Sequence, residues 1–364
     1  MKTALTGIKV IDISVNAPGP FASMMLADMG AEVISVVNPI QAKPDYAGAA
    51  DDPMLAGRGG PNDALARGKS RLPLNLKSEK GRADLLQLVR TADVFISEMR
   101  PGKLEALGLG WDVLGSENPR LVSCEITGYG SKAPHATRAG HDINYLALSG
   151  ALSLIRDGRG KPVAPQNIIG DYAAGGTLAV SAILAALLER GRTDKGQRIC
   201  LSMTDGVRYL LSDISAATVL GGHPEETWRG SLCGGMPTYD TYATSDGGWV
   251  AAGALELKFI AEIGRKLGWP ELTGLMERKE GWPEARKGLT ERFKARSLDD
   301  WSSVFADSDA CVTPVLSLAD AHPRGMPELA DVLGQCARSH DATEWARSTV
   351  LTARFSIDPG ASCV

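Results

Sequence analysis

The chain has 364 residues and a mass of 38.4 kDa, with 39 basic and 43 acidic residues and a net charge of −4. This length predicts two domains, and a composition of 44% hydrophobic and 23% charged residues excludes wholesale disorder. The charge balance lacks the basic excess that sequence-independent binding of nucleic acid requires.

The first 125 residues alternate strand and helix patterns. Strands are predicted over residues 8–14, 31–37, 72–76, 93–97 and 120–126. Helices are predicted over residues 18–29, opened by prolines and ended by Gly30, and over residues 78–91, whereas residues 42–66 read as a loop. This alternation predicts an α/β fold, in which helices cover a mainly parallel sheet in a Rossmann-like layout.

The middle and last parts of the chain have a different pattern. A helix is predicted over 172–190, and a second region begins near Asp205 with a long helical pattern to about residue 220. Short strands follow at 239–243, 248–252 and 311–316, with helices at 256–267, 283–295 and 298–306. This second region predicts a smaller α+β domain.

Cysteine usage and hydropathy point to a cytoplasmic protein. The six cysteines form no C-x-x-C pair, so we expect a reducing compartment and neither a disulfide framework nor a zinc site. No signal peptide is read at the N-terminus. The most apolar stretch, residues 173–188, is interrupted by glycine, threonine and serine, and predicts a buried helix instead of a membrane span.

The first strand–helix junction argues against a dinucleotide site. It reads SVNAPGPFASMM and lacks the G-x-G-x-x-G fingerprint, with Gly19 standing alone between two prolines. Pyrophosphate binding needs close backbone approach through several glycines. We therefore expect neither NAD nor FAD.

Three predicted helices begin with ionisable residues. His141 and Asp142 open the run INYLALSG, Asp171 opens the long helix, and Glu256 opens LKFIAEIGRKLG. The helix dipole and its unpaired N–H groups favour a carboxylate, keep an imidazole neutral and can hold a developing oxyanion. An Asp in this position is more often only a helix cap, and a lone histidine is more often structural. Spacing alone does not bring the three together.

Basic residues lie next to two of the predicted strands. Arg67, Lys69 and Arg71 precede the strand at 72–76 and Lys77 follows it, while Arg100 and Lys103 follow the strand at 93–97. Ligands of such sheets bind at strand ends, and these side chains suit phosphates. A solvated run of charges is the alternative interpretation.

The segment GHDINYLALSG, residues 140–150, resembles the α-methylacyl-CoA racemases of the family III CoA-transferase superfamily. Further matching segments are APGPFASMMLADMGAEV (17–33), RPG (100–102), ITGYG (126–130), GALE (253–256) and DACVTPVL (309–316). The resemblance implies an interlocked homodimer that acts on acyl-CoA thioesters without a metal or redox cofactor. It also implies a large domain over 1–203 to which 332–364 return, a linker helix at 204–228, a small domain at 229–318 and a linker at 319–331.

The resemblance also implies roles for individual residues. His141 and Asp171 correspond to the two bases that remove and return the α-proton, Glu256 pairs with the histidine, and the N–H of Asp142 is the natural donor to the enolate oxygen. The matching positions for coenzyme A contacts are Arg67, Lys69, Leu74, Asn75, Leu76, Lys77, Arg100, Gly140, Ile143, Asn144 and Tyr145. The chain departs from the family at Ser35 and Asn38, where cations are usual.

Two other functions remain open at this point. In a family III CoA-transferase, the aspartate at position 171 would be a nucleophile that forms an acyl anhydride. The GHD histidine and Tyr145, which such transferases usually lack, favour the racemase. An inactive CoA-binding homologue is the third hypothesis, and the intact His141, Asp171 and Glu256 argue against it. The sequence does not identify the acyl group.

Overall fold

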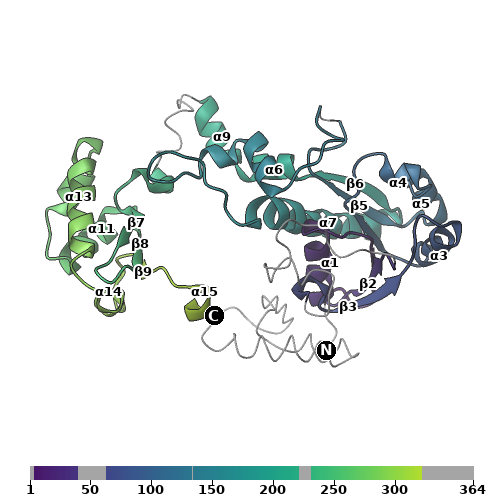
Figure 1. The fold of residues 1–364 in the computed structure, drawn as a ribbon, viewed down its shortest axis with the longest axis horizontal. Coiled ribbons are helices and arrows are strands. Elements are labelled where there is room, and N and C mark those ends of the chain that lie inside the picture. The colour runs from purple at the N-terminus through teal and green to yellow at the C-terminus, as the bar shows by residue number, and fades with distance from the viewer. Residues whose placement is uncertain (1–3, 40–62, 133, 221–230, 322–364) are drawn as a thin grey trace. The chain divides into compact units, whose positions relative to one another are not determined.

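The computed structural model describes residues 4–39, 63–132, 134–220 and 231–321. These residues form two compact units (Figure 1). The first contains the described residues up to Ala151 and those from Ala164 to Ser212; the second contains Leu152–Val163 and the described residues from Asp213 onward. The predicted return segment 332–364 lies outside the described residues, as does most of the predicted linker 319–331.

The first unit is built on a parallel six-stranded sheet. Its strands are β1 (Lys9–Asp12), β2 (Glu32–Val37), β3 (Lys69–Pro73), β4 (Val94–Ser97), β5 (Val122–Thr127) and β6 (Gln197–Ser202). They lie in the order β3-β2-β1-β4-β5-β6, and every neighbouring pair is parallel. This order confirms the predicted Rossmann-like α/β fold, with its switch point between β1 and β4.

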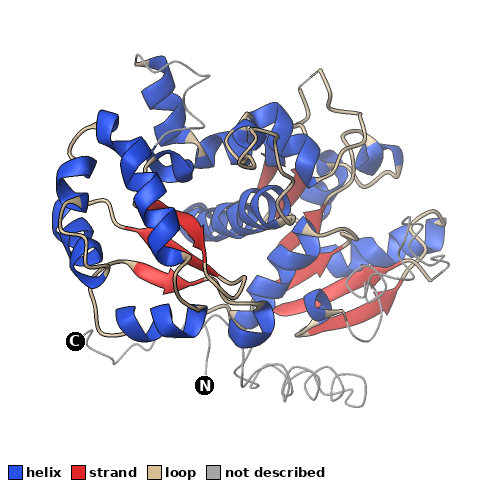
Figure 2. Ribbon diagram, turned by 60° about the vertical axis from the view of Figure 1, so that its left-hand side comes forward, coloured by secondary structure: helices blue, strands red, loops and turns tan. Residues whose placement is uncertain are grey.

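Helices cover both faces of this sheet (Figure 2). One face packs on α1 (Pro18–Asp28) and α7 (Leu178–Thr193), and the other on α3 (Glu79–Val89), α4 (Lys103–Ala106) and α5 (Trp111–Glu117). Consecutive residues of a strand pack on opposite faces of the sheet: Ile96 packs in the core with α1, whereas Phe95 packs in the core with α3. Strands buried on both sides read as continuous apolar runs, which explains why the sequence pattern was clear here.

The structure corrects several predicted elements of this unit. Strand β3 begins at Lys69 and ends at Pro73, three residues earlier than predicted at each end. Strand β6 and helices α4 and α5 were not predicted. The long helical pattern after residue 203 is divided at Leu211 into α8 (Met203–Leu210) and α9 (Ser212–Val219). The division occurs because Leu211 adopts φ −88° and ψ 10°, outside the helical region.

The long apolar helix begins earlier than predicted. A π-helix, η3 (Ile168–Thr177), runs directly into α7, and the combined 26 residues are long and apolar enough by composition to cross a membrane. Within the described part of the chain this is the one such helix. Its Ala179, Val180 and Ile183 are buried in the core cluster against the sheet, in agreement with the predicted buried helix. The helix therefore serves as a core element of this unit.

The second unit contains a small antiparallel sheet. Strands β7 (Tyr239–Ala243), β8 (Trp249–Gly253) and β9 (Val312–Pro314) are paired in that order. Its helices are α11 (Leu257–Lys266), α12 (Leu272–Met276), α13 (Trp282–Phe293), α14 (Leu298–Phe305) and α15 (Leu318–Ala321). The core is aromatic: Phe293 stacks on Tyr242 at 5.3 Å and packs edge-on against Trp301 at 5.4 Å. Gly288 leaves room for Trp269, since a Cβ there would lie 2.3 Å from the indole ring.

Candidate active site

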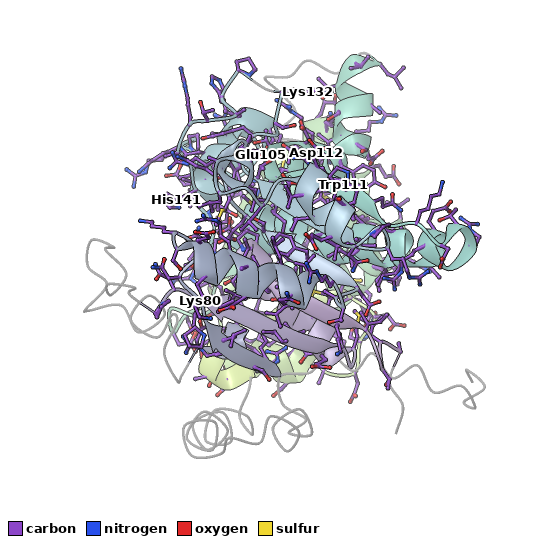
Figure 3. The ribbon with its side chains drawn as sticks, turned by 90° about the vertical axis from the view of Figure 1, so that its right-hand side faces the viewer. Lys80, Glu105, Trp111, Asp112, Lys132 and His141 are labelled. Atoms are coloured by element: carbon purple, nitrogen blue, oxygen red, sulfur yellow. The ribbon has the colours of Figure 1, made fainter. Side chains whose placement is uncertain are left out.

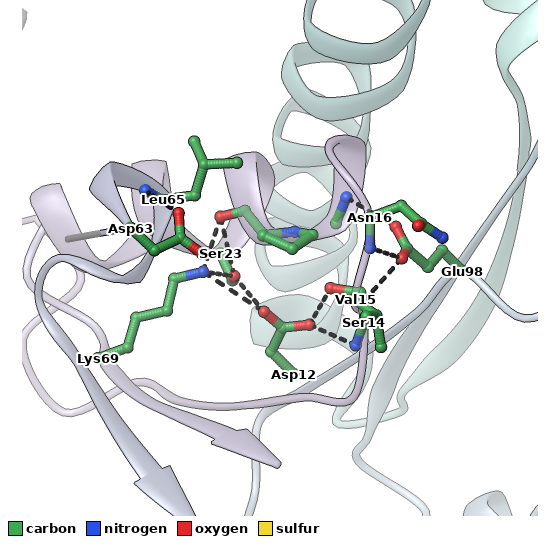
Figure 4. A network of polar contacts seen from close by, with 11 residues as sticks. Asp12, Ser14, Val15, Asn16, Ser23, Asp63, Leu65, Lys69 and Glu98 are labelled. Atoms are coloured by element: carbon green, nitrogen blue, oxygen red, sulfur yellow. Dashed lines mark hydrogen bonds and ion pairs between the residues drawn. The ribbon is translucent and has the colours of Figure 1, made fainter. Parts of the chain in front are cut away.

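The turn between β1 and α1 holds an internal carboxylate (Figure 4). Glu98, which directly follows β4, accepts hydrogen bonds from the backbone N–H groups of Val15 at 2.7 Å, of Asn16, and of Gly19 at 3.4 Å. Burial raises the pKa of Glu98 to about 7, and these N–H bonds oppose the shift. The backbone donors that a dinucleotide-binding fold offers to pyrophosphate are thus engaged by a side chain of the protein.

Two of the predicted phosphate contacts are engaged in ion pairs. Lys69 Nζ lies 3.5 Å from the Asp12 carboxylate and donates to Ser23 Oγ at 2.6 Å and to the Pro20 carbonyl at 2.7 Å (Figure 4). Its side chain is 2% exposed, and burial lowers its pKa, with the attraction of Asp12 opposing the shift. Arg67 binds both oxygens of Asp28. A phosphate contact by Lys69 would require that side chain to leave this network.

The predicted contacts after β3 lie in a turn and not in a strand. Leu74 N–H still bonds to the Val37 carbonyl at 2.9 Å, but Asn75 then begins a tight turn in which its Oδ1 accepts from the Lys77 N–H at 3.0 Å. Leu76 is partly buried and Lys77 is exposed. The stretch forms the β3–α3 connection at the carboxyl edge of the sheet, the edge at which such folds bind ligands.

His141 occupies the N-cap of α6 (Asp142–Ser149), as the sequence predicted. The helix begins here because His141 has an extended backbone, with φ −129° and ψ 175°, and because its N–H bonds to Asn144 Oδ1 at 3.0 Å. The imidazole side chain is exposed (Figure 3). Asp142, the first helical residue, has an N–H that no carbonyl of the helix can accept. Ile143 is exposed beside it.

Asp142 joins this helix to the segment that carries Asp171. Asp142 is 6% exposed, and its carboxylate accepts the Asp171 N–H at 2.7 Å as well as the N–H of Gly170. Burial raises the pKa of Asp142, and the nearby charge of Asp171 adds to the rise, while the two N–H bonds oppose it. Gly170 is required because a Cβ would lie 2.6 Å from Asp142 Oδ1. Asp142, which directly follows His141, is therefore hydrogen-bonded to the backbone of Asp171.

Asp171 lies in the first turn of η3 instead of at its N-cap, which is Asn167. One of its carboxylate oxygens accepts from Asn167 Nδ2 at 3.0 Å. Arg100 is exposed in the turn after β4, and its charge and that of Asp171 both act on the phenol of Tyr145. Burial is the main reason why the pKa of Tyr145 is raised. Arg100 and Asp171 are therefore both close enough to Tyr145 for their charges to affect its hydroxyl.

Glu256 belongs to the second unit. It is the N-cap of α11, with φ −84° and ψ 141°, and it follows β8 as the sequence predicted. The pairing of Glu256 with His141 stays a prediction. Among the described residues, no group of three or more His, Cys, Asp or Glu side chains is placed to hold a metal ion.

Sequence reasoning missed Glu98. The signal was present, because an acidic residue directly after an apolar strand reaches the carboxyl edge of the sheet, beside a turn that lacks the usual glycines. It also missed Asp12 and Asp28, whose carboxylates engage Lys69 and Arg67. Partners so distant in the sequence are visible only in the fold.

The chain resembles known proteins over most of its length. The sequence pattern of CoA-transferase family III matches residues 5–356. Human alpha-methylacyl-CoA racemase is 39% identical over 319 residues, covering 87% of this chain and 79% of that protein; human succinyl-CoA:glutarate CoA-transferase is 32% identical, covering 85% and 71%. A crystal structure of a CAIB/BAIF family protein from Brucella suis matches with a TM-score of 0.73 at 27% identity, over 91% of this chain and 88% of that one. With a match that spans nearly its whole length, the chain belongs to CoA-transferase family III.

Proposed function

We propose that this chain is a 2-methylacyl-CoA racemase, an isomerase that interconverts the R and S epimers of 2-methylacyl-CoA thioesters. The proposal rests on the hydrogen bond between the Asp171 N–H and the Asp142 carboxylate, which holds the Asp171 turn against the helix capped by His141. It is supported by the likeness to the human racemase, which exceeds the likeness to the human transferase. No cofactor is needed, because coenzyme A is part of the substrate.

The proposed reaction needs a base on each face of the α-carbon. One group, His141 or Asp171, removes the α-proton, and the thioester becomes a planar enolate with a negative oxygen. The other group delivers a proton to the opposite face, so that the configuration inverts and no atom is gained or lost. The N–H of Asp142 at the start of α6 has no acceptor within the helix and suits the enolate oxygen, because helix N-termini stabilise negative charge. Glu256 is proposed to orient the imidazole of His141.

The substrate's coenzyme A portion is proposed to lie along the carboxyl edge of the sheet. Lys77 and Arg100 are exposed there, and they are the two predicted cations best placed to meet phosphates. Leu74, Asn75, Leu76, Gly140 and Ile143 would supply the contacts along the pantetheine and adenine portions. Gly140, partly buried before His141, suits close approach of the thioester.

We also propose a homodimer in the cytoplasm. Several large apolar side chains are exposed in the single chain: Leu188 at 74%, Tyr209 at 70%, and Val219 and Leu220 at 85% and 86%. Exposed apolar surface of this kind is typical of interfaces. Sedimentation velocity should give a mass close to twice 38.4 kDa, and a monomer at micromolar concentration would contradict the dimer.

Proton NMR in D₂O tests the racemase directly. Each epimer of a panel of 2-methylacyl-CoA thioesters is incubated with the enzyme, and loss of the α-proton signal and of optical purity are followed together. We expect both epimers to gain deuterium and to reach the same mixture. The absence of deuteration with every member of the panel would refute the proposal.

A CoA-transferase is the second candidate, because human and bacterial CoA-transferases also match the chain at 31–34% identity. In that reaction the Asp171 carboxylate would attack the thioester carbonyl and release coenzyme A as a thiolate. Hydroxylamine would then convert the activated Asp171 carboxyl to a hydroxamate, and borohydride would reduce it to an alcohol. A racemase forms no covalent acyl-enzyme, so trapping at this residue separates the two functions.

A further inference from the structure

The peptide plane before His141 is held at both ends. Its carbonyl, that of Gly140, accepts a hydrogen bond from the Tyr145 hydroxyl at 2.5 Å. Its N–H, that of His141, donates to Asn144 Oδ1 at 3.0 Å. A peptide group is planar, so fixing its two polar atoms fixes its orientation, and with it the φ angle of His141. The backbone then sets the direction of the His141 Cα–Cβ bond, from which the imidazole extends.

A second tyrosine holds the preceding carbonyl. The Tyr129 hydroxyl donates to the Ala139 carbonyl at 3.3 Å, and the Tyr129 and Tyr145 rings pack edge to face with centroids 5.2 Å apart. The two rings are 9% and 7% exposed and belong to the core cluster of the large sheet. Buried tyrosines with bonded hydroxyls have little rotational freedom. The exposed chain that carries His141 is therefore tied to the rigid core.

Two glycines shape the space for these rings. A Cβ on Gly128 would lie 2.4 Å from the Tyr145 ring, and a Cβ on Gly140 would lie 2.2 Å from the Tyr129 hydroxyl. Both distances are far below van der Waals contact, so a larger residue at either position would displace a tyrosine. The two tyrosines can therefore pack here only because both positions are glycine.

We propose that Tyr145, with Tyr129 and Asn144, is a positioning residue for His141, and that its role is to orient the base instead of contacting coenzyme A. This inference rests on the proposed racemase function. A Gly140 carbonyl free to rotate would change the backbone before His141 and so move the imidazole. The hydrogen bond from the Tyr145 hydroxyl opposes that rotation. Misplacing a catalytic group by about 1 Å can cost on the order of 100-fold in rate.

Tyr145→Phe tests the inference, because it removes the hydroxyl and keeps the ring. We expect kcat to fall by about 10- to 100-fold while KM changes by less than about threefold. Tyr129→Phe removes the longer hydrogen bond, that to the Ala139 carbonyl, and should lower kcat less than Tyr145→Phe does. Tyr242→Phe is the matched control: Tyr242 is also buried and donates to a carbonyl, that of Pro237, at 2.6 Å in the second unit. Tyr242→Phe should lower the free energy of unfolding about as much as Tyr145→Phe does, and should keep kcat within about twofold of the wild-type value.

Deuterium wash-in distinguishes positioning from general damage. If His141 alone is displaced, Tyr145→Phe should lose α-proton exchange from the epimer that His141 deprotonates and largely keep exchange from the epimer that Asp171 deprotonates. Equal loss from both epimers in a folded variant, or an unchanged kcat, would overturn the inference. If the unaltered enzyme exchanges neither epimer, the proposed function fails first, and the two failures are thereby distinguished.

Discussion

Glu98→Gln should change how the stability of the protein depends on pH. The carboxyl of Glu98 has its pKa raised from the ordinary 4.5 to about 7, chiefly by burial. A group with a raised folded-state pKa stabilises the fold fully below its unfolded pKa, and this contribution is lost as the pH rises through the folded pKa. Each pKa unit corresponds to about 1.4 kcal/mol, so the contribution lost between pH 4.5 and 8 is up to about 3 kcal/mol.

Glutamine has nearly the same shape, and its carbonyl can still accept from the N–H groups of Val15 and Asn16. The variant should therefore resemble the protonated wild type and lack this pH dependence. Urea denaturation followed by circular dichroism at pH 5, 6, 7 and 8 gives the free energy of unfolding for both proteins. The variant should gain about 2.5 kcal/mol relative to the wild type between pH 5 and 8, because part of the titration lies below pH 5.

The control is Glu291→Gln, which removes an exposed carboxylate on α13. The difference in free energy of unfolding between this variant and the wild type should stay nearly constant over the same pH range. A difference between wild type and Glu98→Gln that also stays constant, within about 0.5 kcal/mol, would refute the reasoning. It would mean that the Glu98 carboxylate is as well stabilised in the fold as in water.

Three further predictions concern the site and the two cores. His141→Ala and Asp171→Ala should each abolish interconversion of the epimers, while equilibrium dialysis with coenzyme A shows nearly unchanged binding; full racemisation by either variant would contradict the two-base assignment. Lys69→Met should lower the free energy of unfolding by about 3–5 kcal/mol, because it leaves the Asp12 carboxylate buried without its cation; a urea midpoint equal to that of the wild type would contradict it. Gly288→Ala should cost about 1–3 kcal/mol through overpacking against an indole ring, and a rise in melting temperature would contradict that packing.

The fold could be predicted from the sequence to the extent that its strands are buried on both faces. Strands β1, β2, β4 and β5 were found because each is a short apolar run between turn signals. Strand β6 was missed because exposed and partly buried residues alternate along it, with Arg198 bonded to Glu125 on the neighbouring strand. An edge strand has only one neighbour and so tolerates polar side chains.

The candidate site could be predicted only in part. The helix-start positions of His141 and Glu256 follow from local pattern and are found as expected. The contact of Asp142 with the Asp171 N–H spans 29 residues of sequence and depends on how two connections pack, which no spacing rule supplies. The same holds for Lys69: its place beside a strand was readable, but its burial against Asp12 was not.

The π-helical start of the long helix has a consequence for how this protein can change. A π-helix holds about one residue more per turn than an α-helix, so η3 is equivalent to an α-helix that has absorbed an insertion. Deleting one residue from this turn would let it wind as an α-helix and leave α7 packed on the sheet. The amides of Gly170 and Asp171 would then rotate away from the Asp142 carboxylate. In the proposed racemase, the loss of one residue here would impair catalysis and leave the sheet and its covering helices in place.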